Sequence, residues 1–594
     1  MRTAPLAFLA LLVGLFGLWG CHGNTPLDRV LLWADEAEWV QWPDGWAQAV
    51  AVDAPRTFGV APGVDRFRAV ALPVADSTDL RLTVGDEDVV RRIDGPTPID
   101  LDLGSADSVT LAPDEGVYLL RPRMVSSARQ GRRILLVVAD TLRYDHATPE
   151  LMPEVHRYFE GGTRFLQAHS AAAWTLPSVA AIFTGQIPAR LRSPDGVLIS
   201  LPTGTPTIAS ELARRGYANV AVTANYTVHH ENRYSTGFDL FLVPDPKAGQ
   251  FADAAWLNRQ ALDSARWLDD EDLFLYLQYM EPHDPYRDHE AGGALKPPPT
   301  GSEASEAELE GLRRAYASEV RHLSRQLDAL LNQLGEVDLA IFTSDHGEEI
   351  GDHGGFRHGL TLFEESVHVP LLVRGRGIEA QTIAEPVSLV DLKDFILDRH
   401  DTSWPIDAPV TAEGFGFGPP RWSQVQGATR VIYSAVPIEP KAPEHPSERW
   451  LRATHPRVAF THLDDATPVD PDGPVIERSL RGLVDHFAGF RRGVYVLVRQ
   501  GAAATLTVRG AGRDGLIWGA AEQVEVTAEA GDSLRVEVAS PDPFALVFLP
   551  VENDVTPELE APESATVWFD EGPPERKAAE VGETLERLRA LGYI

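Results

Sequence analysis

The stretch Ile134-Leu135-Leu136-Val137-Val138-Ala139-Asp140 joins a continuous apolar run to an acidic residue. Such runs are typical of strands buried on both faces of a parallel sheet. A second apolar run, residues 339–344, leads into Asp345 and His346. Ligands of open α/β sheets collect at the carboxyl ends of the strands, so these residues are expected to converge there. Two carboxylates and one imidazole suit a divalent cation.

Thr175 lies between these runs in the sequence, in Trp174-Thr175-Leu176-Pro177-Ser178. A free threonine hydroxyl is a poor nucleophile, but a divalent ion can lower the pKa of a bound oxygen from about 16 towards 7. Pro177 stands where the first helical turn would begin, and a helix N-terminus there would direct amide donors at an incoming anion. The sequence therefore predicts a metal-activated threonine nucleophile.

In the region around these residues, predicted strands alternate with helices, which is the pattern of an α/β domain. Its predicted strands are residues 134–139, 219–224, 273–279 and 339–344. The clearest helix starts at Ser305, where Glu308 completes a capping box, and apolar residues then recur every three or four positions as far as Leu334. That apolar stripe is interpreted as core.

The chain of 594 residues is too long for one hydrophobic core. Short alternating runs between residues 30 and 125 predict a small β-sandwich, and β texture returns near residue 493 after a Pro-rich connection. The predicted boundaries are 1–21 for a signal segment, 22–130 for a β-rich domain, 131–400 for the α/β domain, 401–490 for its extension or a linker, and 491–594 for a C-terminal β-rich module and tail.

The N-terminus resembles a bacterial lipoprotein signal. Arg2 is followed by the uncharged residues 4–18 and then by Leu18-Trp19-Gly20-Cys21. Cys21 would be the acylated first residue of the mature chain. Because it is the single cysteine, the chain has no internal disulfide. The apolar run is shorter than the roughly 20 residues of a spanning helix. We expect a lipid-anchored membrane protein outside the cytoplasm, in a bacterial cell envelope. Trp19 is bulkier than usual there, which leaves an ordinary signal peptide or an uncleaved anchor open.

The formal net charge of −34 makes nucleic acid an unlikely class of partner. An acidic surface also opposes highly sulfated polyanions, although a metal ion and local histidines can reverse the field inside one pocket.

Several stretches together resemble the sulfatase-like branch of the alkaline phosphatase superfamily. They are residues 134–143, 174–178, 343–348, 362–371 and 385–392, with a terminal Leu591-Gly592-Tyr593-Ile594 like that of many bacterial members. The resemblance covers about residues 131–400. It implies an α/β fold with a central mixed, mostly parallel sheet flanked by helices, with the N-terminal and C-terminal β-rich modules outside it. It also implies a hydrolase that acts on phosphate or sulfate esters.

By this resemblance Asp140, Asp345 and His346 would bind one divalent ion, Mg, Ca, Mn or Zn, and Thr175 would be the nucleophile that also touches it. Each residue alone has a structural alternative, because Thr175 could be a plain helix N-cap and either aspartate could cap a helix. The resemblance further implies two catalytic histidines. His283 would contact the non-bridging oxygens of the substrate, and His358 would assist the leaving group.

Other polar residues are less determined by the sequence. His353 competes with His358 for the role at the leaving group. The sequence does not orient Asn225, His229 and His230, which are further candidates for the substrate pocket. Arg143 fits a site residue and a structural ion-pair residue equally well.

The chain departs from sulfatases at the nucleophile. Sulfatases convert the first residue of a Cys/Ser-x-Pro-x-Arg motif to formylglycine, whereas this chain has Thr175 and, at the arginine position, Val179. No formylglycine is therefore expected. An esterified threonine has no second hydroxyl to expel sulfate, so water must attack the intermediate directly, which favours phosphate esters. Thr141 replaces a second acidic residue and indicates a single-metal site.

Two alternatives remain at this point. The covalent intermediate could be transferred to a sugar or lipid hydroxyl, which would make the protein a phosphoryl-group transferase. The chain could also be a catalytically silent surface-binding lipoprotein. The missing arginine at Val179 supports the silent role, whereas the retained metal ligands argue against it.

Overall fold

The computed structural model describes most of the chain as far as residue 398 and shorter pieces beyond it. The described residues are 29–32, 36–127, 131–191, 198, 200–244, 252–398, 404, 410–414, 420–426, 429–437, 458–462, 493–499, 502–512, 516–519, 524–528, 533–539, 544–551, 555–560 and 565–570. The predicted lipidation site, Cys21, lies outside them. The chain divides into two compact units, one of residues 1–43 and 47–130, the other of residues 44–46 and 131–594.

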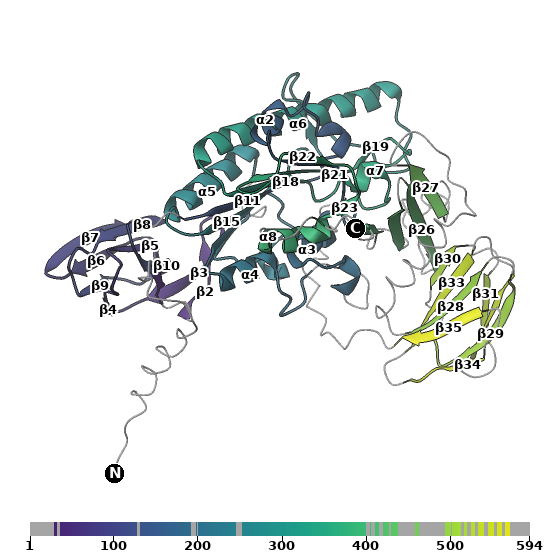
Figure 1. Ribbon diagram of the computed structural model, residues 1–594, viewed down its shortest axis with the longest axis horizontal. Helices are drawn as coiled ribbons and strands as arrows, with labels where there is room; N and C mark the ends of the chain where they lie inside the picture. The colour runs from purple at the N-terminus through teal and green to yellow at the C-terminus, as the bar shows by residue number, and fades with distance from the viewer. Residues whose placement is uncertain are drawn as a thin grey trace, which may run out of the picture. The chain divides into compact units, whose positions relative to one another are not determined.

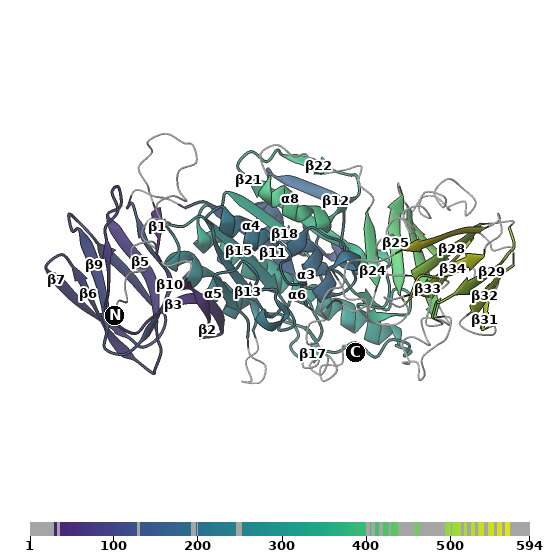
Figure 2. The same cartoon turned by 90° about the horizontal axis from the view of Figure 1, so that it is seen from below.

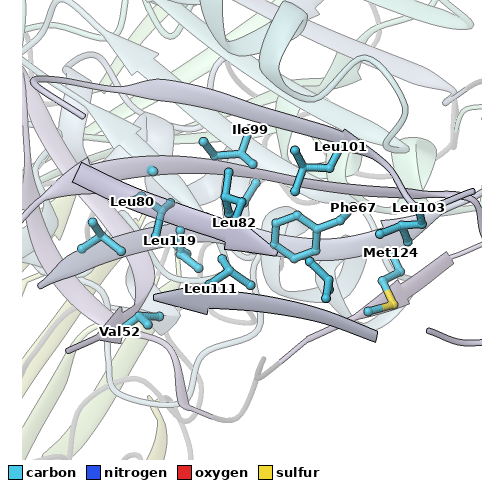
Figure 3. Close-up of a cluster of buried hydrophobic side chains, with 14 of the residues drawn as sticks. Val52, Phe67, Leu80, Leu82, Ile99, Leu101, Leu103, Leu111, Leu119 and Met124 are labelled. Carbon is cyan, nitrogen blue, oxygen red and sulfur yellow. The ribbon is translucent and has the colours of Figure 1, made fainter. Parts of the chain in front are cut away.

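The first unit is built from two β-sheets. One sheet has the order β2 (Glu38–Trp42), β3 (Gly45–Val52), β10 (Val117–Val125), β5 (Arg66–Pro73) and β8 (Thr97–Asp102), with β1 (Arg29–Leu31) beside β10. The other has the order β4 (Arg56–Gly59), β9 (Ser108–Pro113), β6 (Thr78–Val84) and β7 (Glu87–Ile93). Alternate residues of both sheets, including Phe67, Leu82 and Leu119, form one buried apolar cluster (Figure 3). This is the predicted β-sandwich.

The second unit contains a large mixed sheet. Its order is β22 (Gln381–Ile383), β12 (Thr163–His169), β21 (His368–Gly375), β18 (Leu339–Thr343), β11 (Arg133–Ala139), β15 (Leu273–Tyr279), β13 (Ala218–Thr223) and β14 (Leu240–Leu242), with β23 (Val387–Ser388) beside β12. The neighbours from β18 to β14 are parallel, whereas β21 runs antiparallel to β18 and β12. The predicted mixed, mostly parallel sheet is confirmed.

Helices cover both faces of this sheet (Figure 1). On one face lie α2 (Pro153–Tyr158), α5 (Ala254–Trp267) and α6 (Glu306–Leu334), and on the other lie α3 (Thr175–Thr184), α4 (Ile208–Arg214) and α8 (Leu392–Leu397). The long helix α6 begins as predicted, because Ser305 caps it and forms a capping box with Glu308. Its apolar stripe, including Leu323 and Leu327, is buried. Among the described helices, none is long and apolar enough to cross a membrane.

The register of the central strands decides where the candidate site forms. Val138 on β11 pairs with Thr343 on β18 and with Gln278 on β15. Since all three strands are parallel, they end at the same edge of the sheet. The residues that follow them, Asp140 and Asp345 among them, therefore start from neighbouring points.

Strands make up most of the described C-terminal part (Figure 2). One sheet has the order β24 (Thr411–Gly414), β25 (Arg421–Gln426), β26 (Thr429–Pro437), β30 (Leu516–Gly519), β33 (Phe544–Pro550), β28 (Gly493–Arg499) and β35 (Ala565–Asp570), with β27 (Val458–His462) beside β26. A second sheet has the order β31 (Val524–Ala528), β32 (Ser533–Val538), β29 (Ala504–Arg509) and β34 (Glu558–Glu560). Val496, Leu506, Val536 and Val547 belong to the apolar cluster that the two sheets share.

Candidate active site

Three buried side chains form a metal-type cluster at the carboxyl edge of the central strands. One ligand atom from each of Asp140, Asp345 and His346 lies within 4.8 Å of the others. The Nε2 atom of His346 is 3.7 Å from Asp140 Oδ1 and 3.5 Å from Asp345 Oδ2. All three side chains are fully buried. The structure thus brings the three predicted ligands together.

The donor atoms in this cluster fit a cation. Within the described part of the chain, Asp140 Oδ1 and Asp345 Oδ2 are buried and accept no hydrogen bond. His346 Nδ1 lies 2.8 Å from the carbonyl oxygen of Gly347, so it carries the proton and leaves the Nε2 lone pair facing the carboxylates. Burial lowers the pKa of His346 to about 4, which keeps the ring neutral. Two unpaired carboxylate oxygens and an imidazole lone pair repel one another unless a cation lies between them.

Thr175 is the first residue of helix α3, and its hydroxyl reaches this cluster. Its Oγ1 lies 3.3 Å from His346 Nε2, and the residue is 4% exposed. Trp174, not Thr175, is the N-cap of the helix, and its side chain makes no capping hydrogen bond. Thr175 therefore does not have the capping role that was its structural alternative.

Asn225, which the sequence left without an orientation, belongs to the site. Its Nδ2 donates to Asp140 Oδ2 over 2.6 Å and lies 3.4 Å from Thr175 Oγ1. Its Oδ1 accepts from the backbone and the hydroxyl of Thr227, which fixes the orientation of the amide. Gln278, on β15, also donates to Asp140 Oδ2, over 3.1 Å. The only signal for Gln278 in the sequence is an amide residue near the end of an otherwise apolar strand.

The backbone after Asp140 turns sharply. Thr141 has a φ of 61°, a left-handed conformation that is rare for a β-branched residue. The hydroxyl of Tyr316, from the buried face of α6, donates to the Thr141 carbonyl over 2.7 Å and accepts from the Arg143 amide over 3.0 Å. The strained turn thus depends on a core residue of α6. Neither Asp140 nor Asp345 is the N-cap of a described helix.

The two predicted catalytic histidines lie beside the cluster. The ring centroid of His358 is 4.6 Å from that of His346 and 5.1 Å from that of His283. Burial opposes protonation of His283, but the carboxylates of Asp140, Asp284 and Glu348 outweigh it and raise its pKa. Burial, followed by the neighbouring histidines, lowers the pKa of His358. The two rings are therefore tuned in opposite directions.

Glu348 contacts His358, and the sequence did not single it out as a site residue. Its Oε2 lies 3.3 Å from His358 Nδ1, and its Oε1 accepts from the Tyr286 hydroxyl over 2.7 Å. Burial raises the pKa of Glu348 to about 8. Glu348 therefore orients the His358 ring through Nδ1.

The remaining polar candidates make other contacts. His353 contacts Glu365 and stacks on Phe363. Arg143 forms ion pairs with Asp145 and Asp352, both at 2.7 Å, and is therefore a structural ion-pair residue. Two further histidines bond within their own segment, namely His229 with the Glu231 amide and His230 with Ser235.

Part of the chain is similar to known sulfatases. Residues 132–401 match the Sulfatase family model. The chain is 28% identical over 221 residues to arylsulfatase K of Mus musculus, which covers 32% of this chain and 38% of the mouse protein. It is 41% identical over 85 residues to arylsulfatase K of Canis lupus familiaris, which covers 14% of this chain and 15% of that protein. The matches span well under half the length of these relatives.

Among solved structures, a phosphonate monoester hydrolase from Silicibacter pomeroyi superposes with a TM-score of 0.46 and 16% identity, over 60% of this chain and 95% of that one. Members of the sulfatase superfamily use a divalent metal, and Asp140, Asp345 and His346 form a possible site for one. Residues 132–401 of this chain thus resemble a sulfatase domain.

Proposed function

We propose that this protein is a metal-dependent ester hydrolase that works through a covalent Thr175 intermediate and prefers phosphate esters to sulfate esters. The observation that carries the proposal is the position of the Thr175 hydroxyl, 3.3 Å from His346 Nε2. Beside it lie two buried carboxylate oxygens that accept no hydrogen bond from the part of the chain that the structure describes. Residues 132–401 match the Sulfatase family model, and the chain is similar to proteins named arylsulfatases. Both similarities support an ester as the substrate class.

Asp140, Asp345 and His346 would hold the divalent ion, with Thr175 Oγ1 beside it. The ion supplies positive charge that lowers the pKa of the threonine hydroxyl and offsets charge on the ester oxygens. Asn225 keeps the hydroxyl and Asp140 in a fixed relation, because its amide nitrogen reaches both. Such fixed geometry removes much of the entropic cost of attack.

The reaction then has two displacement steps. In the first, Thr175 Oγ1 gives its proton to solvent and attacks phosphorus, and the bond from phosphorus to the ester oxygen breaks. The leaving oxygen takes a proton, for which His358 is the candidate donor once the bound anionic ester has raised its lowered pKa. In the second, water attacks phosphorus, the bond to Thr175 Oγ1 breaks, and the threonine regains its proton. His283, whose pKa is raised, would offset charge on the non-bridging oxygens.

The preference for phosphate follows from the nucleophile. An esterified threonine carries one oxygen on its Cβ, so it cannot expel the acid group by collapsing to an aldehyde. Water must attack the intermediate directly, a route open to a phosphothreonine.

We also propose that the protein acts outside the cytoplasm of a bacterium, anchored through Cys21. The uncharged residues 4–18 and the Leu-Trp-Gly-Cys sequence that follows support this. Membrane fractionation of wild type and Cys21→Ala tests it, since release of the variant into the soluble fraction is expected. Retention of Cys21→Ala in the membrane would show that lipidation is not the anchor.

The chemistry is tested with residues 22–594, reconstituted with divalent metal. Turnover of 4-nitrophenyl phosphate, bis-4-nitrophenyl phosphate, phenylphosphonate and 4-nitrophenyl sulfate is compared between wild type, Thr175→Ala and Thr184→Ala. Thr184 is the matched control, because it is buried at the far end of the same helix and bonds the Ala180 carbonyl. We expect phosphoester cleavage that Thr175→Ala abolishes and Thr184→Ala keeps. Preference for sulfate, or full turnover by Thr175→Ala, would contradict the proposal.

A further inference from the structure

A second group of ligand-type side chains lies outside the catalytic cluster. Glu349, His353 and Glu365 each place one ligand atom within 4.8 Å of the others. The side chain of Glu349 is 2% exposed and that of Glu365 is 8% exposed, whereas that of His353 is 42% exposed. The group thus has two buried carboxylates and one imidazole at its solvent side.

One carboxylate oxygen of this group accepts no hydrogen bond from the described residues. In the portion of the chain that the structure describes, Glu349 Oε1 is buried and forms no hydrogen bond, although Oε2 accepts from the Thr361 hydroxyl over 2.8 Å. Oε1 is directed into the cluster, 3.8 Å from His353 Nδ1. A buried carboxylate oxygen without a donor is costly, so it indicates a positively charged partner at this point.

The surrounding chain holds these groups in place. A Cβ at Gly355 would come within 2.5 Å of Glu349 Oε2, so the backbone passes directly against that carboxylate. The Phe363 ring stacks on His353 at 3.9 Å between centroids, and His353 Nδ1 contacts Glu365 Oε1. The ligand atoms are therefore positioned by packing, which lowers the ordering cost of binding an ion.

We propose that Glu349, His353 and Glu365 bind a second divalent ion, of the zinc or manganese class, that serves as a structural clip. One imidazole and two carboxylates favour these ions over calcium or magnesium, which prefer oxygen ligands alone. The exposed side of His353 leaves room for water to complete the coordination.

The position of the group gives the ion its role. Glu349 belongs to β19 (Glu349–Ile350), which pairs with β20 (Phe356–Arg357), and Glu365 belongs to α7 (Glu364–Val367). Glu348 comes directly before this hairpin and His358 directly after it. An ion at this point would fix both ends of the hairpin against α7. Since Glu348 and His358 flank the hairpin, the ion would also fix the Glu348–His358 contact at the catalytic cluster. This goes beyond the proposed function and does not depend on it.

Calorimetric titration of the untagged, chelator-treated protein with Zn²⁺ tests the proposal. The Asp345→Asn variant isolates the second site, because it removes a ligand of the catalytic cluster. We expect this variant to bind one equivalent that disappears in Asp345→Asn/His353→Ala and in Asp345→Asn/Glu365→Gln. The control is Asp345→Asn/His289→Ala, which breaks a matched His–Glu pair, His289 with Glu319 at 2.9 Å, and should keep the equivalent.

Thermal melting of the same variants guards against loss of folding. Zn²⁺ should raise the Tm of Asp345→Asn and of its His289→Ala control, but not that of the two cluster variants. Failure of Asp345→Asn to bind any Zn²⁺, or binding that survives both cluster substitutions, would overturn the second site. Because no turnover is measured, this result is independent of whether Thr175 is the nucleophile.

Discussion

Asn225 donates a hydrogen bond from Nδ2 to Asp140 Oδ2 over 2.6 Å, and this contact joins the loop after β13 to the end of β11. The same nitrogen lies 3.4 Å from Thr175 Oγ1. The bond leaves the other oxygen of Asp140 for a cation. One amide therefore sets the orientation of both a predicted metal ligand and the predicted nucleophile.

Asn225→Ala should lower kcat by about 10- to 100-fold, the usual effect of removing a residue that orients a metal ligand. The fold should persist, because the substitution deletes one amide at the edge of the sheet. Steady-state kinetics with a phosphate ester checks this, with Asn232→Ala as control. Asn232 is buried in the same segment and bonds the Thr227 carbonyl. Equal losses in both variants would assign Asn225 a purely structural role.

Metal removal should destabilise the protein through the Asp140–Asp345–His346 cluster. A ligand that binds only the folded state at 1,000 times its Kd adds about 4 kcal/mol of unfolding free energy. We expect chelation to lower the Tm of wild type, and to lower it less in Asp140→Asn/Asp345→Asn, which binds no ion at this cluster. Differential scanning calorimetry measures both shifts. The same drop in the double variant would place the stabilising ion elsewhere.

His358→Ala should slow esters with poor leaving groups more than esters with good ones. If His358 protonates the leaving oxygen, its loss costs on the order of 10²–10⁴ for an alkyl phosphate but little for 4-nitrophenyl phosphate. His289→Ala, which alters a ring that pairs with Glu319 instead, should leave the slope unchanged. A series of aryl and alkyl phosphates gives the slope. An equal loss across the series would remove His358 from this step.

Glu281 should make the stability of the protein fall as the pH rises from about 4.5 to 7. Burial raises the pKa of Glu281 to about 7, so the folded protein keeps a proton that the unfolded chain loses above its ordinary pKa. The loss between these limits is on the order of 3 kcal/mol, and the contribution is constant below and above them. Glu281→Gln keeps an acceptor for the Ala254 amide and should flatten this slope in urea denaturation. An unchanged slope would contradict the assignment.

The sequence predicted the central strands well because their apolar runs are nearly continuous. Residues 273–279 were expected as a strand and are β15, and the run before Asp140 ends at Ala139 as expected. The same pattern predicted where the metal-type residues lie, since parallel strands that end together bring their next residues together. The capping box at Ser305 likewise marked the start of α6.

The hydrogen bonds that support the candidate site could not be predicted from the sequence pattern. Gln278 and Glu348 act through hydrogen bonds across strands and loops, and no local period encodes such contacts. His353 lies within the β19–β20 hairpin and His358 directly follows it. Only the fold shows that His358 lies beside His346 while His353 contacts Glu365. Spacing alone leaves such a choice open.

Mass spectrometry of the acid-quenched protein during turnover of a phosphate ester tests the covalent Thr175 intermediate directly. We expect a phosphoryl group on the peptide that contains Thr175, formed and lost at rates compatible with kcat and absent from Thr175→Ala. Efficient phosphate release with an unmodified Thr175 peptide, under conditions in which a synthetic phosphothreonine peptide survives the quench, would contradict a covalent threonine mechanism.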